Sequence, residues 1–411
     1  MKDWKRLTGM GLLLVTGTAP GWGLEVEGLE GSVLIDGRIR YEVASQTGLD
    51  DSHAITARLR LGYETAKYNG VSLLVEGEGT LPLDKDTYDP YPGGQGTAGK
   101  AVIADPESLE LNRVQVDWRN EQVNVTLGRQ RIIRNNARFI GNVGWRQNEQ
   151  TYDAVTAGYQ PMEGVSLFYG YLDKAIRIFG SKANNPVQRK FDMESHAMEA
   201  QWAPKKGLKT GAYGYLLGIK NNPADSSDTF GAWVAGDTAM GSSGDYSFSW
   251  HAELANQHDN SHSPAGSDFS LSYLHLTAGL KKNALGSVSL GYEFLEGDGS
   301  RGFSTPLATL HAFNGFADVF LSTPSTGLRD TYLKVSAPLG SDWTATALWH
   351  DFRGDYNSIR YGEEVDLVLA WKINQNLSAT GKAAFYNGAR AAPGSASANI
   401  TKIWIQLDAK Y

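Results

Sequence analysis

The first residues that suggest chemistry are arginines spaced two positions apart. Arg38 and Arg40 form one such pair, and Arg58 and Arg60 form the next. In an extended chain, residues two apart project to the same face, so each pair directs its guanidinium groups together. Guanidinium groups bind carboxylates and concentrate anions, and they repel one another unless acids offset them. The candidate acids are Asp36, Glu76, Glu78 and Asp117.

A second candidate site is a run of aspartates in LDKDTYD. Asp84, Asp86 and Asp89 are spaced in a way that suits a hard cation such as calcium. The segment lacks the glycine and the terminal glutamate of an EF-hand loop. We therefore expect no metal or other cofactor, and a structural calcium ion is the alternative.

Two histidines next to acids suggest a hydrolase. His350 precedes Asp351, and His311 lies near Asp318. Barrel lipases use a serine together with a histidine, but no serine-containing motif accompanies either pair. We predict that the protein is not an enzyme.

The elements that must hold the arginines are strands. In residues 55–64, ITARLRLGYE, Leu59 and Leu61 fall on one face of an extended chain and Arg58 and Arg60 fall on the other. The same alternation recurs in about eighteen segments of about 8 to 11 residues, the length that a tilted strand needs to cross a bilayer. The pattern predicts an all-β protein.

Connections between these segments alternate between short and long. The short ones are 67–70, 119–122, 160–164, 203–207, 281–286 and 372–376, with 236–245 the one over-long short turn. The long ones include 80–108, 130–151, 173–194 and 296–327. Outer-membrane barrels have short periplasmic turns at one end and long external loops at the other. The alternation predicts a single antiparallel transmembrane barrel of about eighteen strands.

Aromatic residues and the last segment give independent support for a barrel. Eight aromatic residues are predicted at one level, beside the short turns, as in the interfacial girdle of a barrel: Tyr63, Trp118, Tyr159, Trp202, Tyr246, Trp343, Trp371 and Tyr411. The final segment, KIWIQLDAKY, has an apolar residue at every second position and ends on the aromatic Tyr411. An open edge of this kind promotes aggregation, whereas a closed barrel pairs it with the first strand, near residues 33–43.

Composition limits the other classes of protein. The amino terminus has basic residues followed by an apolar run, which predicts a signal peptide over 1–23 and a barrel over 24–411. After residue 23 no apolar run reaches the roughly 20 residues of a spanning helix. The chain has no cysteine, and its net charge of -7 disfavours nucleic acid as a partner.

Energetics then decides which face of each strand meets lipid. An arginine on the lipid face at mid-bilayer costs roughly 2 to 4 kcal/mol, so Leu59 and Leu61 are predicted to face lipid and Arg58 and Arg60 the lumen. The segment 128–153 adds Arg129, Arg131, Arg134, Arg138 and Arg146. Two placements are open for this basic segment: it folds inward and narrows the channel, or it lies at the external surface against lipid phosphates.

Several long motifs resemble one known family. LGRQRI, RFIGNVGWRQNEQTYDAV, TPLATLHAFNGFADVFLSTPSTGLRDTYL and WHDFRGDY are similar to the alginate export porins of Gram-negative outer membranes. The resemblance implies an eighteen-stranded barrel with an electropositive constriction for an anionic polysaccharide. It assigns site residues only at matching positions, which are Arg129, Arg131, Asp153, Arg329 and Asp330.

Together these observations predict an outer-membrane porin that passes anionic solutes, with both termini in the periplasm. Its expected partners are outer-membrane lipid, lipopolysaccharide and an anionic solute or acidic saccharide. The first alternative is a general or sugar-specific porin with little charge selectivity, and a barrel hydrolase is the remote one. The predicted pore-lining residues are Arg38, Arg40, Arg58, Arg60, Arg113, Arg129, Arg131, Asp153, Arg329 and Asp330.

Overall fold

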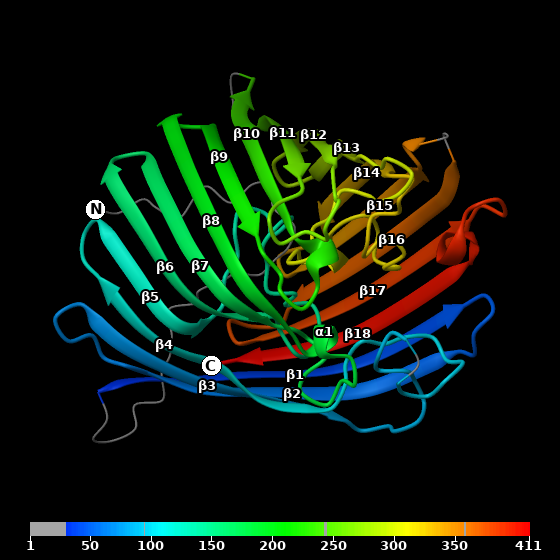
Figure 1. The fold of residues 1–411 in the computed structure, drawn as a ribbon, viewed down its shortest axis with the longest axis horizontal. Helices are drawn as coiled ribbons and strands as arrows, with labels where there is room; N and C mark the ends of the chain where they lie inside the picture. The colour runs from blue at the N-terminus through cyan, green and yellow to red at the C-terminus, as the bar shows by residue number, and fades with distance from the viewer. Residues whose placement is uncertain (1–29, 94, 242–244, 357–358) are drawn as a thin grey trace.

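The protein forms one closed antiparallel β-barrel of eighteen strands, which confirms the predicted fold (Figure 1). The computed structural model describes residues 30–411 apart from 94, 242–244 and 357–358. The predicted signal peptide, 1–23, lies outside the described residues. Each strand pairs with its neighbours in sequence, and β1 pairs with β18 to close the barrel.

Six of the eighteen strands have the predicted 8 to 11 residues, and the other twelve have 12 to 16. The strands are β1 Gly31–Gln46, β2 Ser52–Thr65, β3 Val71–Pro82, β4 Ser108–Arg119, β5 Val123–Gln130, β6 Thr151–Met162, β7 Val165–Ile176, β8 Lys190–Lys205, β9 Leu208–Leu217, β10 Ser227–Met240, β11 Tyr246–His258, β12 Ser270–Lys282, β13 Gly286–Leu295, β14 Leu328–Pro338, β15 Trp343–Arg353, β16 Arg360–Lys372, β17 Leu377–Gly388 and β18 Ile400–Lys410. Residues 236–240 of the predicted over-long turn 236–245 are strand, since β10 continues to Met240.

In residues 30–411, apart from the gaps named above, helical structure is confined to the connections. The short helices are α1 Pro186–Arg189 and the 3-10 turns η1 Pro223–Asp225, η2 Leu310–Ala312 and η4 Gly394–Ser397. Among the described residues, no helix has the length and apolar character needed to span a membrane.

The two faces of the strands differ as predicted. Leu59 and Leu61 are 47% and 52% exposed on the outside of β2, whereas Arg58 and Arg60 are 3% and 5% exposed on the inside. Exposed aromatic side chains lie at the strand ends beside the short turns: Trp118, Tyr159, Trp202, Tyr246, Trp343, Trp371 and Tyr411. Trp343 and Trp371 stack across β15 and β16, with ring centroids 4.7 Å apart. The barrel therefore has an apolar outer band with an aromatic rim.

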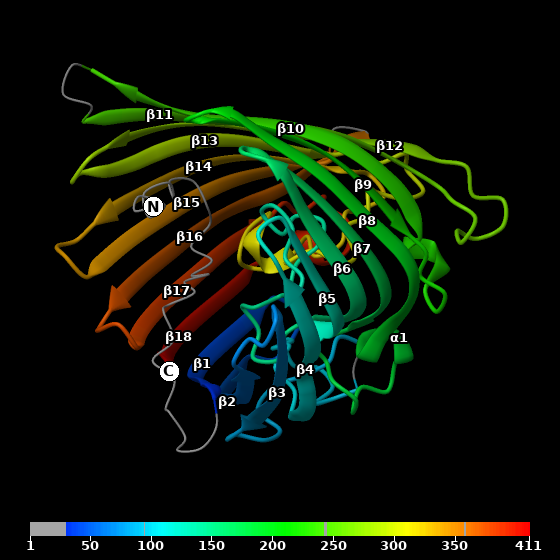
Figure 2. The ribbon, with the colours of Figure 1, turned by 90° about the vertical axis from the view of Figure 1, so that its left-hand side faces the viewer.

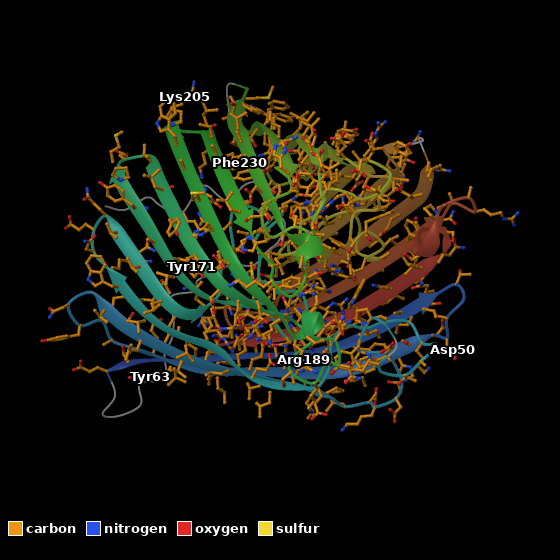
Figure 3. All side chains as sticks on the ribbon, in the orientation of Figure 1. Asp50, Tyr63, Tyr171, Arg189, Lys205 and Phe230 are labelled. Atoms are coloured by element: carbon orange, nitrogen blue, oxygen red, sulfur yellow. The ribbon has the colours of Figure 1, made fainter. Side chains whose placement is uncertain are left out.

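The ends of the barrel are distinct. Tyr63 and Lys205 lie toward the end with the short turns, and Asp50 lies at the opposite end (Figure 3). Both ends of the described chain reach the short-turn end, since the backbones of Ile35 and Tyr411 are hydrogen-bonded to each other. Two long connections, 131–150 and 296–327, fold into the barrel and lie inside its ring of strands (Figure 2).

Candidate solute path in the barrel lumen

One side of the lumen carries a ladder of arginines, which we call the arginine wall: Arg38, Arg40, Arg58, Arg60 and Arg113 on β1, β2 and β4. Strand register sets Arg38 directly opposite Arg58 and sets Asp36 opposite Arg60. Arg38, Arg40, Arg58 and Arg60 face inward, as the strand alternation predicted, whereas Arg113 faces inward because of a break in that alternation.

Every arginine of this wall is paired with a carboxylate. Arg38 Nε lies 2.7 Å from Asp408, and Arg40 Nη1 lies 3.1 Å from Asp105. Arg58 pairs with Asp36, and Arg60 pairs with Glu78. The positive charge of the arginine wall is largely offset by these carboxylates, because opposite charges at these distances attract strongly in a partly buried site.

Arg113 reaches the lumen through a β-bulge. The register between β3 and β4 shifts at Glu76, so that Asn112 and Arg113 both turn toward this acid. Asn112 Nδ2 donates to Glu76 at 2.8 Å, and Arg113 Nη2 lies 2.7 Å from its other oxygen. A bulge re-aims a side chain in this way by adding one unpaired residue to a strand.

The loop 131–150 is docked on the arginine wall by hydrogen bonds and ion pairs. Arg38 Nη1 donates to the Trp145 carbonyl at 2.9 Å, and the Arg40 guanidinium lies 4.3 Å from the Trp145 ring centroid. Arg146 Nη1 donates to Glu42 at 3.0 Å. Of the two placements left open for this basic segment, the inward one is therefore correct.

Glu149 joins this loop to the arginine wall. It accepts from Arg131 Nε and from Asn112 and Asn142 at 2.7 Å each, and Arg60 lies 3.8 Å away. Burial by itself raises the pKa of Glu149, but Arg131 and Arg60 outweigh burial and hold that pKa well below its usual range. The carboxylate therefore stays ionised while the loop is docked.

The same loop also crosses to the opposite side of the lumen. Arg138 Nε lies 2.7 Å from Glu293 on β13, and Arg134 pairs with Glu199 on β8. Loop 131–150 thus contacts both sides of the barrel. Glu149, backbone carbonyls and Arg146 lie toward the arginine wall, and the guanidinium groups of Arg134 and Arg138 lie toward the other side.

The second inserted loop, 296–327, packs against the first. Ile140 and Leu307 form a parallel bridge, and the His311 ring stacks on Trp145 with centroids 5.0 Å apart. His311 bonds Asp318 at 2.7 Å and Lys382 at 2.7 Å. Burial lowers the pKa of His311 to about 3, so the ring is neutral at pH 7.

Asp318 ties this second loop to the barrel. Its carboxylate lies 2.9 Å from Lys402 Nζ on β18 and 3.2 Å from Arg146 Nη2 in the first loop. Burial raises the pKa of Asp318, but the neighbouring His311, Lys402 and Arg146 hold it well below its usual range. The two loops and the barrel wall form one ionic network.

Three residues predicted to line the pore lie on the outer face, and that part of the prediction is wrong. Arg129 and Asp153 are cross-strand partners 2.6 Å apart, and each shares the face of an outward apolar residue, Leu127 for Arg129 and Val155 for Asp153. Arg329 likewise lies on the outer face of β14 and pairs with Asp355. Residues two apart on a strand project to the same side, and this alternation overrides the family motif that suggested a lumen position.

The remaining predicted residues are placed as follows. Asp330 faces inward and accepts a hydrogen bond from His350 at 2.9 Å, and Arg131 binds Glu149 as described above. Within the described ranges, Asp84, Asp86 and Asp89 do not gather into a group of close metal ligands. His311 pairs with Asp318, and His350 pairs with Asp330. The partner in each pair is an acid and not the nucleophilic serine of a hydrolase.

Sequence reasoning missed the acids that complete the network. Asp105, Glu149 and Asp408 come from segments far from the arginines they pair with. Of these three acids, only Asp408 has a signal in the sequence. In a closed barrel β1 and β18 are neighbours, and this pairing places Asp408 beside Arg38.

Comparisons with known proteins show a shared fold. Neither a protein-family model nor a curated protein matches the sequence. OccAB4 of Acinetobacter baumannii is similar in structure, with a TM-score of 0.70 at 11% sequence identity over 93% of this chain and 98% of that one. The chain has the fold of these outer-membrane proteins.

Further similar structures come from Pseudomonas aeruginosa. The outer-membrane protein OpdK, in its structure with vanillate, has a TM-score of 0.71 at 12% identity over 92% of this chain and 98% of that one. OccK9, also called OpdG, has a TM-score of 0.69 at 14% identity over 92% of this chain and 98% of that one.

Proposed function

We propose that the protein is a porin of the Gram-negative outer membrane that passes small hydrophilic solutes through a narrowed lumen. The apolar outer band, the aromatic rim and the closed eighteen-strand barrel support this location. The short turns, and with them both termini, lie on the periplasmic side, and the outer band contacts lipid and lipopolysaccharide.

The inserted loops carry this proposal. Loop 131–150 spans the lumen from Glu42 to Glu293, and loop 296–327 packs against it. An eighteen-strand barrel without such loops has a wide aqueous interior. Export of a long anionic polymer, implied by the resemblance to alginate export porins, requires such an interior. The docked loops therefore favour small solutes over a polysaccharide.

The pairing of the lumen charges with one another predicts that the channel discriminates only slightly between anions and cations. Each arginine of the arginine wall has an acid partner, so the field that concentrates anions is weaker than the ladder alone implies. This supports the alternative of a diffusion porin with little charge selectivity.

A second candidate, a channel for small carboxylates, is favoured by free donors on the same wall. Among the described residues, Arg58 Nε and Nη1 and Arg60 Nη2 are buried without a hydrogen-bond partner, and Arg60 Nη2 lies 3.8 Å from Glu149. A carboxylate solute reaches these donors only when the packing around them opens. A carboxylate accepts such donors readily, and the similar protein OpdK has been determined with vanillate.

Recordings in planar lipid bilayers test the proposal. Purified protein should form channels of small conductance, and a KCl gradient should give a reversal potential near zero. Vanillate should not block the current, and alginate fragments should not enter. A strongly anion-selective reversal potential with block by vanillate would replace the first candidate with the second. Protein that is soluble without detergent and carries no current would overturn both.

A further inference from the structure

The side of the lumen opposite the arginine wall carries a cluster of metal-ligand residues. His251 and Glu253 are two apart on β11 and face inward, and strand register sets Glu253 directly opposite His275 on β12. One ligand atom from each residue lies within 4.8 Å of the others, and His251 Nε2 lies 3.2 Å from Glu253 Oε2. Cross-strand partners of this kind hold their side chains close together.

Two tyrosines, one on each side of the cluster along the barrel wall, are hydrogen-bonded to its residues. Tyr213 on β9 donates its hydroxyl to Glu253 Oε1 at 2.8 Å, and the Tyr332 hydroxyl on β14 lies 2.9 Å from His275 Nε2. Supporting hydrogen bonds orient ligand side chains and fix the tautomer of a histidine in metal sites.

Each tyrosine reaches the cluster across a glycine. A Cβ built at Gly231 would lie 2.3 Å from the Tyr213 ring, and one at Gly291 would lie 2.0 Å from the Tyr332 ring. Glycine at these two positions therefore lets each ring cross the intervening strand.

One buried nitrogen atom of the cluster lacks a hydrogen-bond partner among the described residues. This atom is His275 Nδ1, and His275 is only 8% exposed. A buried nitrogen left without a partner is costly. A hydrogen bond from Nε2 to Tyr332 leaves the Nδ1 lone pair available to a metal ion.

We propose that His251, Glu253 and His275 form a binding site for a divalent transition metal ion, with Zn²⁺ as the representative ion. Two imidazoles and one carboxylate suit zinc, whereas calcium and magnesium prefer oxygen ligands. Ligand atoms on one tetrahedral zinc ion lie about 3.4 Å apart, so side-chain rotations that draw the three ligand atoms together complete the site. The His251 side chain is 21% exposed, which leaves room for a water ligand from the lumen.

Titration calorimetry with ZnCl₂ on untagged protein in detergent tests the site. We expect one saturable Zn²⁺ per chain, and a loss of affinity of at least about 10-fold in His251→Ala and in His275→Ala. His258→Ala is the matched control, because His258 lies exposed at the end of β11, and its affinity should equal the parent's. Heat-modifiable gel mobility verifies that each variant keeps a folded barrel.

X-ray absorption at the zinc edge reads the ligands directly. The parent should show two imidazoles and His251→Ala one, while Gly291→Ala should weaken binding by displacing Tyr332 from His275. Absence of saturable binding, or equal affinity in His251→Ala and the parent, would overturn the proposal. These readouts involve no transport, so they stand apart from the test of the proposed porin function.

Discussion

The two sides of the lumen satisfy their buried acids in different ways. On the arginine wall, Asp36, Glu76 and Glu78 pair with arginines of neighbouring strands. On the opposite side, which we call the tyrosine wall, the acids accept hydrogen bonds from tyrosines of the barrel strands: Glu199 from Tyr215, Glu253 from Tyr213 and Glu293 from Tyr273. The arginines that pair with Glu199 and Glu293 come from the inserted loop 131–150 and not from the strands.

This difference explains how loop 131–150 is oriented in the lumen. Toward the arginine wall it presents the Glu149 carboxylate and the Trp145 carbonyl to arginines. On that side Arg146 pairs with the acid Glu42 of β1. Toward the tyrosine wall the loop presents Arg134 and Arg138. The loop is thus complementary in charge to both walls. A buried charge that loses its partner is strongly destabilising, so the pairs fix one docked position.

The largest expected effect comes from neutralising one acid on the arginine side. Glu149→Gln removes the charge that pairs with Arg131 and lies near Arg60, at a cost of about 3 to 5 kcal/mol to loop docking. Single-channel conductance should rise and fluctuate. Glu253→Gln on the tyrosine wall, recorded with a chelator so that the proposed metal site is empty, is the matched control and should leave conductance unchanged, because an amide oxygen still accepts from Tyr213. Equal conductance in both variants and the parent would remove the distinction between the walls.

A smaller effect, on ion preference, is expected to distinguish arginines in the lumen from arginines on the outer face. Arg58→Gln leaves Asp36 with one fewer cation partner, so ion preference should shift toward cations by roughly 1 kcal/mol. Arg329→Gln, on the outer face of β14, should not move the reversal potential. A shift of the same size in Arg329→Gln would contradict its outward placement.

A gradual effect is expected from pH through His311. Its pKa falls from 6.5 to about 3 in the folded protein, so the unfolded loop binds more protons between those values. The stability of docking is complete above about pH 6.5 and decreases as pH falls, by up to about 1.4 kcal/mol per pH unit. Conductance measured from about pH 7 to about pH 4 should therefore rise in the parent and stay flatter in His311→Gln. Identical profiles would show that His311 does not control docking.

Strand alternation was enough to predict the barrel and the direction of its faces. Leu59 and Arg58 follow from a period of two, and the pairing of β18 with β1 follows from the apolar last segment. The same rule places Arg129 with Leu127 on the outside, where the structure has it, whereas the family resemblance implies a lumen position.

Local sequence patterns do not predict the ion-pair partners that the inserted loops supply. Glu149 and Asp318 meet Arg60 and Lys402 only because two long connections fold inward, and nothing in residue spacing sets that fold. The bulge that turns Arg113 toward Glu76 is likewise a product of strand pairing, since it appears only when β3 and β4 are in register.

A reversible cross-link between the two inserted loops tests the central claim most directly. The chain has no native cysteine, so Ile140→Cys with Leu307→Cys introduces one defined pair at bridged positions. If both loops stay docked during conduction, the disulfide should form readily and the single-channel conductance should be the same oxidised and reduced. A pair that fails to cross-link in folded protein, or a conductance that drops sharply on oxidation, would show that the open channel does not contain these loops as described.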